Sequence, residues 1–406
     1  MKNKNFRLIL IGKIISLSGS SIQRFSLALY LLDLTGSAAT YANILAFSII
    51  PYILFAPIAG SLADNINRKK IMVYLDFFSA ILLGGYSIIL FSGNDNVYII
   101  TAVMFILSIC DTLYAPAVNA AIPQILKEDE LTSANGMIQQ VGGIVNILGP
   151  ILSGALYAAF GIKIIVIVNS ISFAISAILE LFIKLPSINN KKKVKISFLS
   201  SLKEMKGSYV YLKREKNVIL STIASYGLIN IFIVPIFSVF APFLIKVVLG
   251  MSSSIYGIAE GIIAFGLVIG SLFISLRSKS FTMKKIHYTL YPMVLCLILM
   301  VFTNINYNNP WLTLGVFTLG GMGIMISISL SNIISLTYTQ KEIPVQELGK
   351  VGAFSNAIAT ASIPIGQVIF GRLIDSGVQL FIILLITAIA NIMVCYFVQW
   401  NVRRIK

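Results

Sequence analysis

The sequence has little that could support catalysis or metal binding. Its 406 residues include one histidine and three cysteines, and no CxxC pair occurs among Cys110, Cys296 and Cys395. The single histidine, His287, opens an apolar segment, where an interfacial position is commoner than a ligand role. No Ser/His/Asp or Cys/His constellation, nucleotide-binding loop or Walker motif is visible. We therefore expect no enzyme activity, no metal site, no cofactor and no self-contained ATP-driven pump.

Charge is also scarce, and negative charge most of all. Charged residues make up 11% of the chain, with 15 acidic against 31 basic residues, whereas 57% of residues are hydrophobic and the mean hydropathy is +0.90. This composition is typical of a polytopic membrane protein and excludes a soluble domain. Uninterrupted apolar stretches predict twelve transmembrane helices, at 8–31, 41–63, 70–91, 97–118, 132–158, 163–184, 217–244, 253–276, 286–304, 310–337, 347–374 and 378–400.

The basic residues indicate the orientation of these helices. Most lie in the N-terminus, the even-numbered loops and the C-terminal "NVRRIK", as the positive-inside rule requires when both termini are cytoplasmic. The first helix lacks a small-residue cleavage site, so we expect it to be retained. We predict a multi-pass protein of the cell membrane whose basic loops face anionic lipid and bind no nucleic acid.

One long polar segment divides the twelve helices into six and six. It predicts an N-terminal six-helix bundle over 1–184, a cytoplasmic linker over 185–216 and a C-terminal bundle over 217–406. Apolar residues at helical spacing from Phe198 to Leu212 predict an amphipathic helix on the inner leaflet. Short matches recur at an offset near 217, as from Gly149 to Gly366, which favours two pseudo-symmetric halves in a monomer.

The stretch "GSLADNINRKK" carries the first family resemblance. It resembles the loop between helices 2 and 3 of the major facilitator superfamily, with matches at Gly60, Asp64, Arg68 and Lys69. The resemblance implies a loop that latches the two halves together, and an anchored turn is the alternative. Asn67 replaces a glycine of the pattern, and because Asn tolerates left-handed backbone we expect it to preserve the turn.

Three further stretches extend the resemblance over nearly all of the chain. "GGIVNILGPILSG" resembles the helix 5 antiporter signature at Gly149, Pro150 and Gly154, although such residues also serve to pack two helices. "LYAPAVNAAIPQILKEDELTSANG" and "ELGKVGAFSNAIATASIPIGQVIFG" are similar to the drug-exporter branch that includes bacterial macrolide-efflux proteins. The resemblance implies the twelve-helix fold and export by antiport.

Ionisable residues inside predicted helices are candidates for coupling because they are costly there. Asp111 and Glu260, with Asp33 at the outer end of helix 1, are proton-coupling candidates, since a desolvated carboxyl group loads protons readily. Arg24 is a charge partner, and whether Asp111 only neutralises it stays open. In the macrolide-efflux pattern a cation occupies the position of Asp111, so the substrate site of that branch is not assigned to this chain.

Glu180 and the substrate cavity complete the candidate residues. Glu180 precedes Lys184 by four residues, which favours a structural ion pair. A mostly apolar cavity with a few polar groups suits amphipathic molecules. We expect it to be lined from helices 1, 4, 7 and 10, although each residue could equally face a neighbouring helix; the candidates are Gln23, Asn119, Tyr226, Asn230, Phe232, Ser327, Ser329 and Asn332.

These observations predict a proton-driven exporter of amphipathic small molecules, macrolide-like drugs among them, that works by alternating access. Its partners would be the substrate, protons and the lipid bilayer. The alternatives are an exporter of a siderophore, peptide or lipid on the same fold, and a membrane sensor or scaffold that does not transport.

Overall fold

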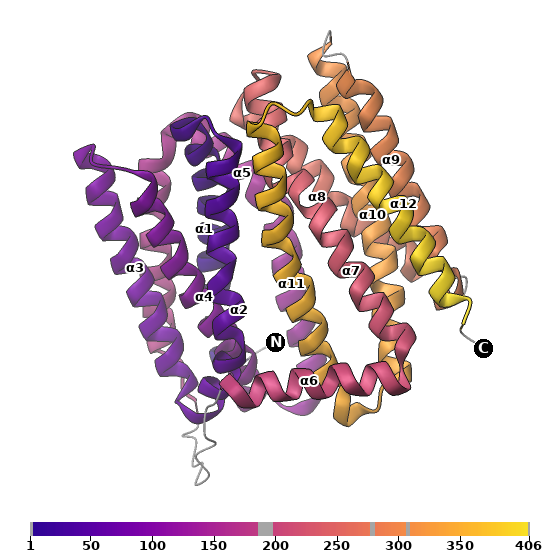
Figure 1. Ribbon diagram of the computed structural model, residues 1–406. Helices are drawn as coiled ribbons and strands as arrows, with labels where there is room; N and C mark the ends of the chain where they lie inside the picture. Colours follow the sequence, from indigo (N-terminus) through magenta and orange to yellow (C-terminus); the bar gives the residue numbers. More distant parts are fainter. Residues whose placement is uncertain (1–2, 186–197, 277–280, 306–308, 405–406) are drawn as a thin grey trace. The chain divides into compact units, whose positions relative to one another are not determined.

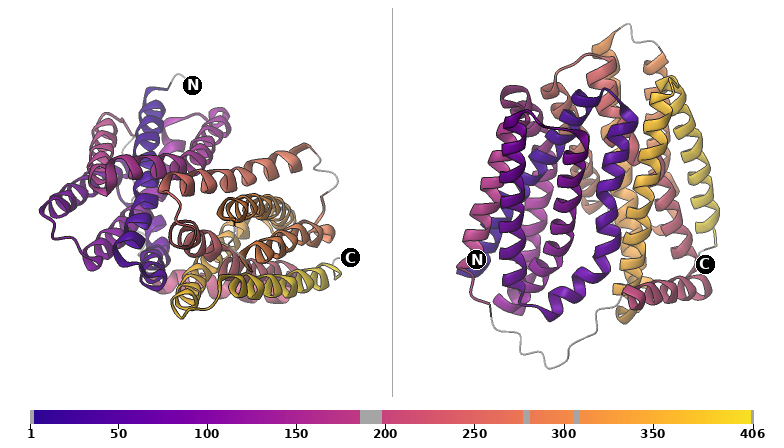
Figure 2. Two further views of the ribbon diagram at one scale, coloured as in Figure 1. Left: turned by 90° about the horizontal axis from the view of Figure 1, so that it is seen from above. Right: turned by 60° about the vertical axis from the view of Figure 1, so that its left-hand side comes forward.

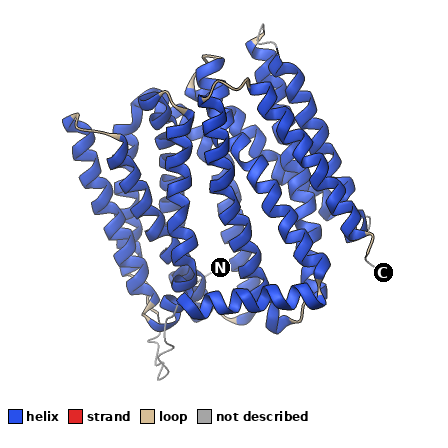
Figure 3. Cartoon of the chain, in the orientation of Figure 1, coloured by secondary structure: helices blue, strands red, loops and turns tan. Residues whose placement is uncertain are grey.

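The computed structural model describes residues 3–185, 198–276, 281–305 and 309–404. Every regular element in these ranges is helical, and none of them contains a strand (Figure 3). The all-α prediction is confirmed. The chain divides into two compact units, one formed by Met1–Leu34 and Phe47–Leu199, the other by Thr35–Ala46 and Ser200–Lys406.

The first unit is built from long apolar helices (Figure 1). They are α1 (Lys4–Thr35), most of α2 (Ala38–Asn65), α3 (Arg68–Ser92), α4 (Val97–Ile125) and α5 (Glu128–Leu181). A buried cluster at the end of the unit where α3 begins includes Phe6, Ile9, Met72 and Val118. It joins the start of α1 and α3 to the end of α4, and so holds together the helices that carry the pocket described below.

A single helix, α5, contains two of the predicted membrane crossings. Its apolar part, Ser133–Leu181, is 49 residues long, whereas about 20 residues cross a bilayer. The helix breaks at Gly161, whose φ of 67° and ψ of −178° are accessible only to glycine. This break lies between the predicted segments 132–158 and 163–184, so the two crossings follow each other with almost no loop.

The second unit contains the remaining helices. They are α6 (Phe198–Glu215), α7 (Asn217–Pro235) with the π-helical turns η1 (Ile236–Phe240) and η2 (Phe243–Val248), α8 (Ser253–Leu276), the 3-10 turn η4 (Met283–Lys285), α9 (His287–Ile305), α10 (Pro310–Glu342), α11 (Val345–Asp375) and α12 (Leu380–Val402). Ten helices among the described residues are long and apolar enough to cross a membrane. The break in α5 adds one crossing and α1, with Lys13 and Arg24, supplies the twelfth.

The predicted amphipathic helix is present as α6, which extends three residues further, to Glu215. It runs crosswise to α7, as the views in Figures 1 and 2 show. Leu212 is fully buried and packs with Ile219 of α7, Ile343, and Val351 of α11. The structure thus groups most of this helix with the second unit, while its place on the inner leaflet stays a prediction.

The turn between α2 and α3 differs from the expectation in its mechanism. Asn67 has a φ of −58°, so the backbone is not left-handed, and its side chain instead accepts a hydrogen bond from the Lys70 N–H at 3.3 Å. Asn67 therefore preserves the turn as the N-cap of α3, which satisfies a backbone donor that the helix leaves free. The side chains of Gly60 and Asp64 lie outside the described residues.

Lys69 of this loop pattern contacts the end of another helix. Its Nζ donates to the carbonyl oxygen of Leu181 at 2.6 Å, at the end of α5. The last carbonyls of a helix have no partner within the helix and carry partial negative charge, so a cation is favourable there. The loop is thereby tied to the end of α5 within the first unit.

Candidate functional site

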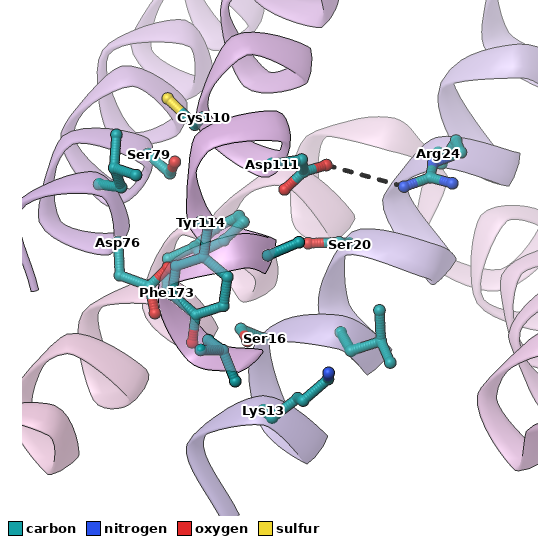
Figure 4. Close-up of a pocket in the computed structure, with 14 residues that line it drawn as sticks. Lys13, Ser16, Ser20, Arg24, Asp76, Ser79, Cys110, Asp111, Tyr114 and Phe173 are labelled. Atoms are coloured by element: carbon teal, nitrogen blue, oxygen red, sulfur yellow. Dashed lines mark ion pairs between the residues drawn. The ribbon is translucent and has the colours of Figure 1, made fainter. Parts of the chain in front are cut away.

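The first unit contains a pocket of about 220 Å³ between α1, α3 and α4, with one wall residue from α5 and with several charged side chains on its mostly apolar walls. Lys13 and Arg24 enter it from α1, Asp76 from α3, and Asp111 and Tyr114 from α4 (Figure 4). Two cations and two acids therefore share a small cavity inside a unit built from membrane-crossing helices. Such groups are retained in apolar helices where they serve a pathway or bind one another.

Arg24 and Asp111 form an ion pair in this pocket. The Nη2 of Arg24 lies 3.7 Å from the Oδ2 of Asp111, and 65% and 52% of their side-chain surfaces are exposed. The sequence left the pairing open, and the tertiary structure brings the two residues together. The long distance and the exposure indicate an accessible pair that contributes little to stability.

A buried acidic pair adjoins the pocket, and neither member was assigned to the functional site from the sequence. Asp76 is 3% exposed and Glu180 is 1% exposed. Glu180 accepts a hydrogen bond from the Tyr114 hydroxyl at 2.6 Å, whereas its expected partner Lys184 is exposed beyond the end of α5. The structural pairing of Glu180 with Lys184 is thus wrong. For Asp76, the signal was available: it is an acid within an apolar segment.

The antiporter-like motif brings α5 close to α1. A Cβ at Gly149 would stand 2.2 Å from the Ser21 Oγ, and one turn later the Ser153 hydroxyl bonds the Ser26 hydroxyl at 2.9 Å. Pro150 and Gly154 are buried in the same stretch. The motif therefore has a packing role, as small residues do between membrane helices. Its part in antiport stays a prediction.

Glu260 and Asp33 have different surroundings. Glu260, in α8 of the second unit, is 8% exposed, and its Oε1 has no hydrogen-bond partner. The buried hydroxyls of Tyr41 and Tyr256 lie within electrostatic range of it. Asp33 is exposed and accepts a hydrogen bond from the Tyr157 hydroxyl at 2.8 Å. Glu260 is thus buried and Asp33 exposed, and a part of either residue in proton coupling stays a prediction.

Several of the expected cavity residues bond to neighbouring helices. Gln23 is 2% exposed and accepts from the Asn169 amide at 2.7 Å, while Asn230 donates to the Ala359 carbonyl at 3.0 Å. Ser329 donates to the Leu267 carbonyl at 2.9 Å.

The other cavity candidates differ in their exposure and contacts. Ser327 donates to the Gly323 carbonyl of its own helix at 3.1 Å. Asn119 and Asn332 are exposed, whereas Tyr226 and Phe232 are half-buried. A substrate role for the expected cavity residues stays a prediction.

The described parts of the chain contain no group of three His, Cys, Asp or Glu residues placed to hold a metal ion. The charged side chains on the walls of the pocket can bind protons and charged groups of an organic molecule. With both signs of charge on its walls, the pocket matches ligands that carry a charged or strongly polar group.

Comparison with known proteins identifies related sequences and folds. The family model described as Major Facilitator Superfamily matches residues 9–366. Macrolide efflux protein A of Streptococcus pyogenes is 25% identical over 373 residues, which cover 91% of this chain and 89% of that protein. Among solved structures, nucleoside transporter NupG matches with a TM-score of 0.78 at 14% identity, over 98% of this chain and 99% of that one. A bacterial homologue of the iron transporter ferroportin, in its inward-facing state, matches with a TM-score of 0.73 at 17% identity over 100% of both chains.

Proposed function

The chain belongs to the major facilitator superfamily, and on this premise we propose that it is a proton-coupled antiporter that exports amphipathic small molecules across the cell membrane. Macrolide-like compounds are the first candidates, because the similarity to macrolide efflux protein A extends over 91% of the chain. Export would proceed by alternating access, with both termini cytoplasmic and with the loop around Asp64 as a cytoplasmic latch. The basic loops support this orientation.

The observation that carries the proposal is the accessible Arg24–Asp111 pair. Both side chains are more than half exposed at 3.7 Å, inside a pocket formed by membrane-crossing helices. A proton or a cationic group of a substrate that binds Asp111 would compete with Arg24 for the same carboxylate. Competition of a proton and a substrate for one site couples their movements in opposite directions, as antiport requires.

Two acids are proposed to carry the coupling proton, Asp111 in the first unit and Glu260 in the second, with Asp33 as a third candidate. The isolated burial of Glu260 supports its role, because an unpaired buried carboxyl group is favoured in its neutral form. Asp111 is balanced by Arg24, which supports the competing view that this acid neutralises the cation without titrating.

Transport by reconstituted protein tests the proposal. Proteoliposomes loaded with a labelled macrolide are placed in a pH gradient, and substrate movement is followed together with internal pH. We expect gradient-dependent movement of both in the wild-type protein, and its loss in Asp111→Asn, in Glu260→Gln or in both. Glu215→Gln, at the exposed end of α6, is the matched control and should transport normally.

Two results would contradict this function. If the wild-type protein moves no proton with any compound of an amphipathic panel, the chain is not a proton-coupled exporter of that class. If both carboxamide variants keep full proton-coupled transport, the two acids are not the coupling sites. Competition by unlabelled siderophores, peptides and lysolipids in the same assay separates the macrolide class from the other cargoes.

A further inference from the structure

Asp76 and Glu180 are buried acids, and neither forms an ion pair with any residue that the structure describes. Asp76 Oδ2 and Glu180 Oε2 are both enclosed and have no hydrogen-bond partner. The two residues lie within electrostatic range of each other, and the Tyr114 hydroxyl, which donates to Glu180 Oε1 at 2.6 Å, is within range of both. Figure 4 shows Asp76 beside Tyr114 at the wall of the pocket.

The charged groups around the pair leave it uncompensated. α1 contributes Lys13 and Arg24, and α4 contributes Cys110, Asp111 and Tyr114. Arg24 is engaged by Asp111, and neither Asp76 nor Glu180 is in an ion pair in the described part of the unit. Lys13 lines the pocket together with Asp76, whereas Glu180 is not a wall residue. Two ionised carboxylates at such positions would be desolvated and would repel each other.

We propose that Asp76 and Glu180 form a proton-binding pair, which holds one exchangeable proton and exchanges it with the pocket through Asp76. The pair resolves its repulsion by retaining one proton on one of the two carboxyl groups, as acids within electrostatic range of each other do. Asp76 is the entry point because it reaches the pocket wall. In this step an O–H bond of a hydronium ion in the pocket breaks, an O–H bond to an Asp76 carboxylate oxygen forms, and a water molecule is left behind.

Tyr114 is a positioning residue for this pair. Its hydroxyl occupies Glu180 Oε1 and leaves Oε2 as the free oxygen of that carboxyl group. A donor to a carboxylate stabilises the ionised form, so Tyr114 tunes the pH at which the pair releases its proton. Removal of the hydroxyl should move that pH upward.

The pair adds a second proton site to the first unit, beside Asp111. Asp111 has Arg24 as a counter-ion, whereas Asp76 and Glu180 have none among the described residues, so the buried pair can hold a proton independently of the ion pair. For its consequence in transport the inference rests on the proposed antiport. The proton site itself does not, and it can be measured without substrate.

Infrared difference spectroscopy on the purified full chain tests the site. Spectra recorded between acidic and alkaline pH reveal the C=O stretch of a protonated carboxyl group, which shifts in D2O. We expect such a band in the wild-type protein, with one component that is lost in Asp76→Asn and in Glu180→Gln and retained in Asp111→Asn; the component of the buried Glu260 is removed only by Glu260→Gln and so identifies itself. In Tyr114→Phe, we expect the band to persist to higher pH. A band that survives unchanged in both Asp76→Asn and Glu180→Gln overturns the proposal.

Folding and transport are controlled separately. Each variant is checked for folding by gel filtration and by thermal unfolding. If an amide variant does not fold, Tyr114→Phe decides the question: the proposal is overturned if the infrared band of this variant disappears at the same pH as the band of the wild-type protein. Failure of wild-type proteoliposomes to couple protons to export would refute the proposed function while leaving the infrared result to decide on the proton site. Loss of proton-driven export in Glu180→Gln, with Glu215→Gln as the matched control, is the expected transport outcome.

Discussion

The contact of Gly366 in α11 with α7 permits a prediction whose size follows from the structure. A Cβ at this position would stand 2.0 Å from the Ile231 carbonyl oxygen and 2.7 Å from the Pro235 Cγ. Ordinary van der Waals contact begins at 3.4 Å, so the overlap with the carbonyl oxygen exceeds 1 Å. The oxygen belongs to helix backbone and cannot rotate away. Gly366→Ala therefore forces α7 and α11 apart.

The magnitude combines two opposing effects. Overpacking of a tight contact costs about 1–3 kcal/mol, and this geometry belongs at the upper end. Alanine in a helix recovers about 1 kcal/mol relative to glycine. We expect Gly366→Ala to lower the free energy of unfolding by about 2 kcal/mol.

The internal repeat and the same helix supply comparisons. Gly149, which corresponds to Gly366 at the offset of 217, faces the Ser21 hydroxyl at 2.2 Å, and a side chain can rotate away where a backbone carbonyl cannot. Gly149→Ala should therefore cost about 1 kcal/mol or less. Gly352→Ala, in α11 with no neighbouring atom within 4 Å, is the matched control and should be neutral or stabilising.

Thermal unfolding with a thiol-reactive fluorophore measures these differences. Cys110 and Cys395 are 5% and 1% exposed and become reactive when the helices separate. We expect the unfolding temperature to fall in the order Gly352→Ala, Gly149→Ala, Gly366→Ala. A Gly366→Ala protein as stable as Gly352→Ala would refute the reasoning, because it would show that α7 and α11 do not approach as closely as the structure places them.

Three further predictions concern single contacts. Asn67→Ala removes the N-cap of α3 and should cost about 1 kcal/mol in thermal unfolding, whereas Asn67→Asp, which keeps a capping oxygen, should not. Lys216 donates to Glu342 at 2.7 Å, and this hydrogen bond raises the pKa of Lys216; Lys216→Met should cost about 0.2–1 kcal/mol at neutral pH. The stability difference between the wild-type protein and Lys216→Met should persist up to the ordinary lysine pKa of about 10.4. It should disappear as the pH rises through the raised pKa of Lys216, because the protonated amine makes the bond. Arg24→Gln should change stability by less than about 1 kcal/mol because its pair with Asp111 is exposed, yet abolish proton-driven export in proteoliposomes.

Each of these has an outcome that would contradict it. An equal loss of stability in Asn67→Asp and Asn67→Ala would mean that the side chain does not cap α3. A Lys216→Met effect that disappears already below pH 9 would contradict the raised pKa. Normal export by Arg24→Gln would show that the ion pair is dispensable for coupling.

Hydropathy was sufficient to predict the membrane-crossing segments because membrane insertion depends on the length and polarity of each segment. The apolar stretches predicted twelve helices, including the two that α5 joins across Gly161. The same information could not show that the break at Gly161 is a single residue, since both a tight break and a short loop satisfy the hydropathy of segments 132–158 and 163–184.

Partners across helices were the part that the sequence could not supply. Spacing along one helix suggested Lys184 as the partner of Glu180, and the structure instead brings Tyr114 from another helix. Asn67 was expected to preserve the turn by adopting left-handed backbone, and it preserves the turn by capping α3 instead. The partner of Glu180 comes from another helix and could be found only in three dimensions, whereas the cap of Asn67 is a local contact with the N–H of Lys70.

The sequence by itself determined the class of the molecule: an all-helical membrane protein of twelve crossings, with its cations in short loops and with the motifs of its family. These properties follow from residues considered one segment at a time. Only the tertiary structure decided which ionisable groups meet. It paired Arg24 with Asp111 and buried Asp76 and Glu180 with no counter-ion among the described residues, because the energy of a charge depends on the neighbours that other helices bring to it.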